Sequence, residues 1–389
     1  MMVLRLYNSR SRDKEEFRPS KGNKVTLYVC GVTPYDTTHL GHAFTYLSFD
    51  ILVRYLKHRG FEVDYAQNVT DIDDDILRRA REEGRNWKVL GNFWTRKYVK
   101  DMKSLNVMQP THFVKATGSI PKIVEIVGAL LRNGFAYKSG RDVYFDVTRF
   151  PRYGKLSGFT TKQMKILLKD RGGDPSDPNK RHPLDFILWQ GKKGMEPSWN
   201  SPWGRGRPGW HIECSAMSNQ YLGSQIDIHG GGRDLVFPHH ESEIAQSESY
   251  TGHYPFARFF MHTAMVMHMG EKMAKSLGNL VLISDLEKQY SPNAIRWILA
   301  SHHYRRVWEY EASELREAEH YAGMINNLRT KTRASYSREL DGLEISEFDK
   351  LMNDDLNTPA ALRLLGDLLE ENGNAATAAY MAKILGFLV

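Results

Sequence analysis

Two of the 389 residues are cysteine, and this scarcity is the first constraint on the protein. Cys30 and Cys214 lie far apart and form no CxxC pair, so a small domain stapled by disulfides is excluded. We expect the chain to occupy a reducing compartment, where the two thiols are not expected to form a disulfide. They are therefore either buried bystanders or ligands of a metal ion.

Long apolar runs are missing as well. No segment approaches the ~20 apolar residues that a membrane-spanning helix requires. The first residues, MMVLRLYNSR, lack the apolar core of a secretory signal. Internal repeats and low-complexity segments are also absent. We therefore expect a cytoplasmic protein with no membrane partner.

The composition that is present is typical of a folded globular protein, with 41% hydrophobic and 25% charged residues. A chain of 389 residues can bury a large core and form two or three structural units. Its formal net charge of +7 favours a polyanionic partner such as RNA, although many basic proteins bind none. The composition makes no prediction about the oligomeric state.

The hydrophobic pattern near the N-terminus alternates between the two regular structures. Residues 25–30 read as a strand that breaks at Gly31, and residues 44–56 carry apolar side chains at helical spacing before Gly60 ends the helix. Residues 61–69 then read as a second strand. The order strand, loop, helix, strand predicts an α/β fold with a doubly wound parallel sheet that binds a nucleotide.

Downstream, the pattern predicts an insertion and a helical end. We expect residues 1–110 and 206–260 to form the two halves of the catalytic sheet domain. An irregular stretch rich in Gly, Pro and Asp marks 111–205 as the insertion between them. Residues 261–300 carry a lysine-rich loop, and 301–389 have a helical period throughout.

Two short motifs suggest phosphate chemistry. THLGH places His39 and His42 at a predicted helix N-terminus, where backbone N–H groups favour phosphate. EKMAKSLGN places Lys272 and Lys275 on a loop that could close over a triphosphate. Taken alone, each motif is equally explained by polar neighbours of a helix start or by a solvated charged loop.

A third set of residues could hold a metal. Two thiolates, an imidazole and a carboxylate complete a tetrahedral zinc site, and the last two are four apart, so one helix face could present both. His240 and Glu241 are competing ligands, and a lone buried cysteine is more often inert packing. The candidate ligands are Cys30, Cys214, His239 and Glu243.

In order along the chain, THLGH and KMAKS resemble the HIGH and KMSKS signatures of class I aminoacyl-tRNA synthetases. Longer blocks from about residue 4 to residue 359 resemble the cysteinyl-tRNA synthetase family: CGVTPYDTTHLGHA, NVTDIDDDI, PGWHIECSAM, DIHGGGRDLVFPHHESEIAQSE and EKMAKSLGN. The resemblance implies the class I synthetase sheet, one Zn²⁺ per chain that binds the thiolate of L-cysteine, and ATP with Mg²⁺ as a substrate.

The resemblance also implies roles for particular residues. It implies that the four candidate ligands hold the zinc and that Trp210 walls the thiol pocket, where the alternative is ordinary core packing. It also implies that His39, His42, Lys272 and Lys275 assist adenylate formation. Ala274 occupies the position at which the family motif has Ser. The adenosine site comprises His39, His42, Asp227, His229, Gly230, Gly231 and Lys275, although a glycine triplet is otherwise a turn. Thr70 and Asp73 are expected near the amino acid, and the acidic run 71–75 could equally be a helix N-terminal cluster.

The acceptor of the activated cysteine is the least determined feature. The chain stops at Val389 shortly after the DDLNTP helices, so we expect no separate anticodon-binding module and a tRNA held by its acceptor end. RGGDPSDP and GMEPSWNSPWGRGRPGW also resemble a relative of the family, the mycothiol ligase, which joins cysteine to the amine of glucosaminyl-inositol.

Two features favour tRNA: Glu243 follows the synthetase pattern, and the net charge suits RNA. The helical end also carries basic residues that could follow an RNA backbone, or could be an ordinary solvated face: Arg305, Arg306, Arg316, Arg329, Lys331 and Arg333. A non-catalytic paralogue that binds cysteine or RNA is the remaining alternative, but its mark would be lost motif residues, and the key ones are present.

Overall fold

A computed structural model of the chain describes residues 3–273, 277–334, 340–371 and 373–389. Its centre is a five-stranded sheet in the order β11-β10-β3-β4-β5, with every neighbouring pair parallel. The strands are β3 (Lys24–Val32), β4 (Glu62–Val69), β5 (His112–Lys115), β10 (Ile226–Gly232) and β11 (Ala257–Thr263). The predicted parallel α/β sheet is confirmed.

The strand order reverses between β3 and β10, which are neighbours in the sheet but lie on either side of the insertion in sequence. Ligands of open α/β sheets bind in the crevice outside the carboxyl ends of the strands at such a switch point. Helix α1 (Leu40–His58) begins at this edge. Its inward face buries apolar side chains at helical spacing, including Phe44, Leu47, Ile51 and Leu56.

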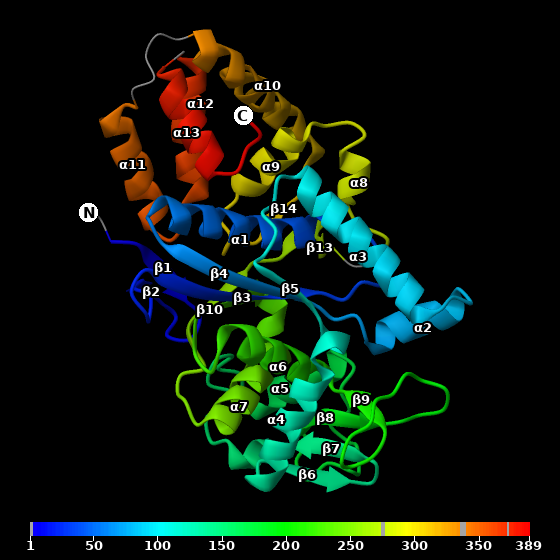
Figure 1. The fold of residues 1–389 in the computed structure, drawn as a ribbon. Helices are drawn as coiled ribbons and strands as arrows, with labels where there is room; N and C mark the ends of the chain where they lie inside the picture. The colour runs from blue at the N-terminus through cyan, green and yellow to red at the C-terminus, as the bar shows by residue number, and fades with distance from the viewer. Residues whose placement is uncertain (1–2, 274–276, 335–339, 372) are drawn as a thin grey trace.

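The insertion forms a separate lobe, the lower one in Figure 1. It contains a four-stranded antiparallel sheet of β6 (Ala136–Ser139), β7 (Asp142–Phe145), β8 (Phe186–Gly191) and β9 (Gly206–Pro208). Its helices are α4 (Ile120–Arg132) and α5 (Thr161–Asp170). Strand β5 lies within the range predicted for the insertion but pairs with β4, so the central sheet extends past residue 111.

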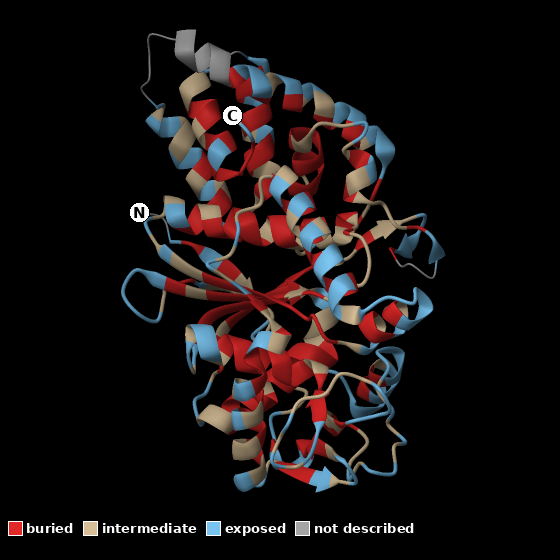
Figure 2. Ribbon diagram, turned by 45° about the vertical axis from the view of Figure 1, so that its right-hand side comes forward, coloured by how far each residue is buried: buried red, intermediate tan, exposed pale blue. Residues whose placement is uncertain are grey.

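Helices cover the remaining faces. Two of them, α2 (Asp74–Glu82) and α3 (Trp87–Ser104), follow β4, and α6 (Trp210–Leu222) and α7 (Glu241–Thr251) lie between the sheet and the insertion lobe (Figure 1). Figure 2 shows buried residues running continuously through the central strands and the helices on both sides. Within the described residues, the structure has no helix with the length and apolar character needed to cross a membrane.

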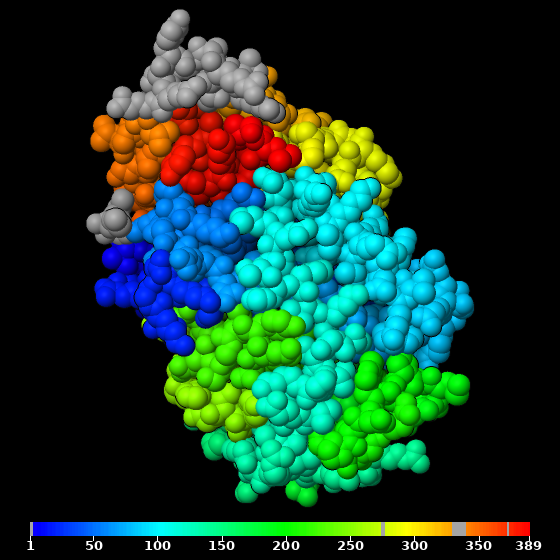
Figure 3. Space-filling view, viewed as in Figure 1, coloured from blue at the N-terminus to red at the C-terminus, as the bar shows by residue number. Residues whose placement is uncertain are grey.

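The C-terminal part is helical, as the periodicity predicts. It comprises α8 (Ile283–Leu286), α9 (Pro292–Ala300), α10 (Ala312–Ala334), α11 (Gly342–Asn353), α12 (Thr358–Glu370) and α13 (Ala375–Ile384). Short strands complete the fold: β1 (Arg5–Asn8), β2 (Asp13–Glu16), β12 (Val266–His268), β13 (Glu271–Lys272) and β14 (Trp308–Glu309). On the face drawn in Figure 3, the C-terminal helical part (yellow to red) lies above the N-terminal segment (blue to cyan), and green segments lie below them.

Two buried polar hubs join the helical part to the sheet domain. Arg296 of α9 is 1% exposed and donates to the carbonyls of Leu105 (2.8 Å) and Leu385 (2.7 Å) and to Asp50 of α1. Asp355, which is fully buried, accepts from the backbone N–H of Tyr7 and from the Tyr304 hydroxyl. Each hub joins segments that are distant in sequence, so the helices and the sheet are tied at two points.

Candidate functional site

A solvent-open cleft of about 440 Å³ lies at the carboxyl ends of β3 and β10. Its walls come from the loop after β3, the start of α1, the end of β10, α6 and the β12–β13 hairpin. Cys30, His39, His42, Trp210 and Lys272 all line it. The switch-point geometry therefore collects residues from both halves of the sheet into one site.

The two histidines of THLGH lie together at the start of α1. His39 is the N-cap, and its Nδ1 accepts from the backbone N–H of Gly41 (3.1 Å). Its ring stacks on that of His42, with centroids 3.7 Å apart. Burial lowers the pKa of His42 to about 4, and burial together with the neighbouring His42 lowers the pKa of His39 further. Both imidazoles are therefore neutral at pH 7 and can donate one hydrogen bond each.

The lysine motif is described in part. Lys272 ends β13 and lines the cleft, and its charge is one of the influences that lower the pKa of His39. Lys275 and Ala274 lie outside the described residues. Lys272 is thus the cation that the described residues place beside the two histidines.

Four buried side chains meet next to the cleft, and one of them, Cys30, lines it. The ligand atoms of Cys30, Cys214, His239 and Glu243 all lie within 4.8 Å of one another. The Glu243 carboxylate is 3.1 Å from Nε2 of His239 and 3.4 Å from Sγ of Cys30. Cys30 lies two residues before the end of β3, Cys214 is on α6, His239 is on η4 (Val236–His240) and Glu243 is on α7, so four elements converge here. The arrangement is a possible metal site with two sulfur, one nitrogen and one oxygen donor.

The ionisation states of these side chains favour the binding of a metal cation. Burial would raise the pKa of Cys214, but a hydrogen bond from the Cys30 thiol and the charge of His239 hold it at about 6. Burial and the Cys214 thiolate raise the pKa of Cys30, so this thiol keeps its proton. His229 and His239 outweigh burial and hold the pKa of Glu243 well below its usual value. One carboxylate oxygen, Oε2, is buried without a hydrogen-bond partner. Two anions and an unpartnered oxygen face one point, which is the chemistry a zinc ion requires.

A second set of ligands overlaps the first. Cys30, His229, His240 and Glu243 also offer atoms within 4.8 Å of one another. His229, predicted for the nucleotide, instead stacks on Tyr28 and lies 3.3 Å from Glu243. The competing candidate Glu241 points elsewhere, because its carboxylate accepts from the backbone N–H of Ser157 (2.9 Å).

Three further residues predicted for the adenosine site are not part of the cleft lining, and their contact with adenosine stays a prediction. Asp227 is not brought to the cleft: it is the second residue of β10, and its carboxylate accepts from Ser20 (2.7 Å) and Thr26 (2.9 Å). A Cβ on Gly230 would lie 2.3 Å from the ring of Phe49, and one on Gly231 would lie 2.9 Å from Leu235. These two glycines make room for protein side chains rather than line the cleft.

The structure offers another carboxylate in the place of Asp227. Asp234, in the short helix η3 (Arg233–Leu235), lines the cleft, and its Oδ1 lies 2.6 Å from where a Cβ of Gly232 would be. Sequence reasoning missed Asp234 although it follows the glycine triplet by two positions. The signal that could have found it is its place just beyond the carboxyl end of β10, where switch-point ligands bind.

Of the residues predicted near the amino acid, Trp210 lines the cleft, whereas Thr70 and Asp73 are not part of its lining. The Trp210 ring lines the cleft and stacks on His239, with centroids 4.3 Å apart. Thr70 is buried beyond the end of β4, where its hydroxyl accepts from Asn68 (3.2 Å). Asp73 is the N-cap of α2, and its carboxylate accepts from the backbone N–H of Asp75 (2.7 Å). Trp210 is therefore the member of this group that contacts both the cleft and the metal-ligand set.

Burial raises the pKa of the Asp73 carboxyl to about 6. An unfolded aspartate titrates near 3.9, so the folded protein binds this proton more tightly and the free energy of unfolding falls as pH rises from about 4 to 6. Asp73→Asn keeps an equally good N-cap and removes the carboxylate. We expect urea titrations to show the variant more stable than the wild type by about 1–3 kcal/mol at pH 7.5, and equal to it at pH 4.

The control for this prediction is Asp341→Asn at the N-cap of α11, whose side chain also accepts from two backbone N–H groups. Its effect on stability gives the baseline for exchanging Asp for Asn at a helix N-cap, against which Asp73→Asn is compared at each pH. A pH-independent effect of Asp73→Asn would show that the buried carboxylate does not titrate in this range.

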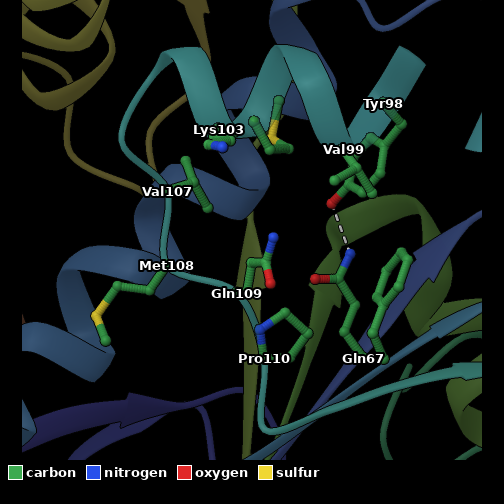
Figure 4. A pocket seen from close by; sticks show the side chains of 10 residues that line it. Gln67, Tyr98, Val99, Lys103, Val107, Met108, Gln109 and Pro110 are labelled. Carbon is green, nitrogen blue, oxygen red and sulfur yellow. Dashed lines mark hydrogen bonds between the residues drawn. The ribbon is translucent and has the colours of Figure 1, made fainter. Parts of the chain in front are cut away.

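A smaller cavity of about 100 Å³ lies outside the cleft, between α3, β4 and the segment before β5 (Figure 4). Its walls are mainly apolar, and the amide of Gln67 donates to the Tyr98 hydroxyl there (2.6 Å). The Tyr98 ring packs edge-on against Tyr46, which lines the cleft. Two aromatic rings thus separate this cavity from the candidate site, and it adds no ligand to it.

The parallel sheet, the histidine pair at the start of α1 and the cleft at the switch point define a class I aminoacyl-tRNA synthetase catalytic fold. Solved structures support the fold alone. A Mycobacterium tuberculosis methionyl-tRNA synthetase in complex with methionyl-adenylate is 13% identical with a TM-score of 0.65, covering 94% of this chain and 90% of that one. An Agrobacterium radiobacter K84 LeuRS ternary complex is 12% identical with a TM-score of 0.67, covering 95% and 84%.

The sequence comparison is more specific. The family model for the tRNA synthetases class I (C) catalytic domain matches residues 16–320, and the chain belongs to this family. A cysteine--tRNA ligase of Thermococcus onnurineus is 45% identical, covering 93% of this chain and 78% of the relative. An L-cysteine:1D-myo-inositol 2-amino-2-deoxy-alpha-D-glucopyranoside ligase of Thermobispora bispora is 43% identical, covering 97% and 92%.

Proposed function

We propose that the protein is a cysteine--tRNA ligase that forms cysteinyl-adenylate from L-cysteine and Mg-ATP and transfers the cysteine to tRNA. The observation that carries the proposal is the convergence of Cys30, Cys214, His239 and Glu243 beside the switch-point cleft, which Cys30 lines. This donor set lies where the side chain of a substrate would enter, and not in a structural module remote from the cleft. The cysteine--tRNA ligase from Thermococcus onnurineus, 45% identical, supports the same substrate.

The four ligands explain how cysteine is separated from serine. A pocket that relies on shape alone discriminates weakly between residues that differ by one atom. Zinc held by these ligands supplies a soft Lewis acid that bonds a thiolate far better than a hydroxyl. Trp210, stacked on His239, closes one side of this pocket.

The first reaction requires positioning and charge stabilisation at the α-phosphate. The substrate carboxylate attacks the α-phosphorus and pyrophosphate leaves. Neutral His39 and His42 donate hydrogen bonds at the positive end of α1, and Lys272 neutralises charge on the leaving group. Asp234 accepts from the ribose hydroxyls. In this proposal Lys275 assists Lys272.

His39→Asn tests the phosphate role without disturbing the helix, because Asn is as good an N-cap as the imidazole it replaces. We expect cysteine-dependent ATP–pyrophosphate exchange to fall about 10²-fold, the loss typical of one preorganised donor. The melting temperature should stay within about 1 °C. His39→Ala, which loses the cap as well, should lower both. Exchange within threefold of the wild type in His39→Asn would remove His39 from the catalytic group.

The second candidate function is transfer of the activated cysteine to the amine of glucosaminyl-inositol. It is favoured by the 43% identity, over 97% of this chain, to the ligase from Thermobispora bispora. The two candidates share the adenylate chemistry and the metal ligands, so they differ only in the acceptor.

Radiolabelled cysteine, ATP and zinc, offered total tRNA in one reaction and glucosaminyl-inositol in another, decide between them. Label in acid-precipitable RNA is the expected result. Label in the amine alone would replace the acceptor and leave cysteine activation intact. Absence of cysteine-dependent pyrophosphate exchange would contradict both candidates and favour a non-catalytic paralogue.

A further inference from the structure

The cavity beside α3 has two aromatic rings in its walls that lie almost parallel. The rings of Tyr98 on α3 and Phe113 on β5 are inclined by 14°, and their centroids are 6.4 Å apart. A planar ring stacked between two others needs two contact distances of about 3.5 Å, or about 7 Å in all. The pair therefore stands close to the spacing at which one flat ring fits between its members.

The walls of the cavity can adjust to such a ring. Phe113 is 38% exposed, so its ring can turn toward solvent without leaving a void in the core. Met102 and Met108 also line the cavity, and their unbranched thioether side chains repack readily around a ligand. Tyr98 is held in place, because it is buried and its hydroxyl accepts from the Gln67 amide (2.6 Å). One wall is thus fixed, and the opposite wall is adjustable.

The size of the cavity suits a single ring that carries a short substituent. Its volume is about 100 Å³, and an engineered apolar cavity of about 150 Å³ holds benzene. Lys103 and Gln109 are exposed members of the lining, so the cavity opens to solvent beside them. Figure 4 shows both to the left of the hydrogen bond between Gln67 and Tyr98. The cavity therefore has an aromatic end and a polar, open end.

The polar end favours an anion. Among the described residues of the lining, none is a carboxylate and Lys103 is the one cation. The nearest acid on α3 in sequence, Asp101, pairs with Lys97 instead (3.8 Å). The side-chain amide of Gln109 offers two N–H donors in addition to the ammonium group. A carboxylate bonds well to such charged and amide donors, so a carboxylate on the ring would complement both ends of the cavity.

An occupant of this cavity would be distinct from the substrates of the cleft. The Tyr98 ring packs edge-on against Tyr46, with centroids 5.3 Å apart, and Tyr46 lines the cleft. Both rings are buried, so they form a wall between the two spaces. A ligand in the cavity and the substrates in the cleft can therefore be bound at the same time.

We propose that this cavity is a binding site for a small planar aromatic carboxylate. The ring of the ligand stacks between Tyr98 and Phe113, and its carboxylate lies beside Lys103 and Gln109. The site is separate from cysteine activation and from the choice of acceptor, so a binding measurement tests it whatever the outcome for those reactions.

The test combines three probes with two pairs of variants. Benzoate is the planar anion, benzamide is its neutral counterpart, and cyclohexanecarboxylate is an anion without a flat ring. Phe113→Leu removes the second ring, and Lys103→Gln removes the charge. The matched controls are Phe93→Leu and Lys100→Gln, which replace exposed residues of α3 outside the cavity lining. Isothermal titration calorimetry on the full chain gives Kd, with and without saturating L-cysteine.

For the wild type we expect benzoate to bind with a Kd of about 1 mM or lower. It should bind about threefold more tightly than benzamide and about fivefold more tightly than cyclohexanecarboxylate. Phe113→Leu should remove the advantage over cyclohexanecarboxylate, and Lys103→Gln should remove the advantage over benzamide. Both control variants should bind benzoate as the wild type does, and L-cysteine should not displace it.

Several results would overturn the site. Benzoate may fail to bind the wild type, or it may bind Phe113→Leu and Lys103→Gln as tightly as the wild type; either result rejects the cavity as its site. Equal affinities for the three probes would show an apolar void without selectivity. A Kd for benzoate that rises in proportion to the concentration of L-cysteine would place the probe in the cleft instead.

Discussion

Cys214→Ser should remove the metal from the protein and lower cysteine-dependent pyrophosphate exchange by about 10³-fold or more. The hydroxyl is neutral and hard, so it does not replace a thiolate that, at a pKa of about 6, is already ionised at neutral pH. Metal content by mass spectrometry and exchange with cysteine and with serine are the two measurements. The ratio of cysteine to serine activation should collapse along with the metal content.

Met217→Leu is the matched control, because Met217 is fully buried in the same apolar cluster as Cys214 and the exchange conserves volume. It should keep its metal and its activity. The overlapping ligand set Cys30, His229, His240 and Glu243 gives the contrary result a specific meaning. If Cys214→Ser retains one metal per chain and His240→Gln loses it, the second set binds the ion and the proposed set is wrong.

Arg296→Met should lower the free energy of unfolding by about 3 kcal/mol or more. The guanidinium is buried and bonds two backbone carbonyls and Asp50, and removing one partner of a buried network leaves polar groups unsatisfied. Asp50 keeps Arg54 as a partner, which limits the loss. Urea unfolding monitored by tryptophan fluorescence measures the effect.

An exposed arginine on the neighbouring helix provides the comparison. Arg363→Met on α12 removes the same charge without a buried partner and should change stability by less than about 0.5 kcal/mol. Equal unfolding midpoints for the two variants would show that the hub at Arg296 adds nothing to the joint between α9, α1 and the C-terminal residues.

The sequence predicts the framework of this protein well because the framework follows from local pattern. Alternating strand and helix periods around residues 25–69 predict the parallel sheet and its edge, and two histidines next to a helix start fall in the cleft as expected. The set of four metal ligands follows from family resemblance, because their positions along the chain do not specify which side chains converge. The structure brings those four together.

A sequence motif does not show how far each of its residues lies from the edge of the sheet where ligands bind. Asp227 lies five residues before the end of β10, about 16 Å from the edge where ligands bind, although DIHGGG reads as a single motif. Gly230 belongs to the same motif, yet its missing side chain accommodates Phe49 of α1, a contact between segments far apart in sequence.

The spread of the four metal ligands has a consequence for how the protein is made. Glu243 is the last of the four ligands to be synthesised. Cys30 therefore lacks a complete ligand set until the ribosome has added the whole insertion and the residues up to 243. Once all four are bound to an ion, β3, α6 and α7 are cross-linked at the two ends of the insertion. The metal site then links the segments that precede and follow the insertion. Replacing the insertion with that of a relative would leave all four metal ligands in place.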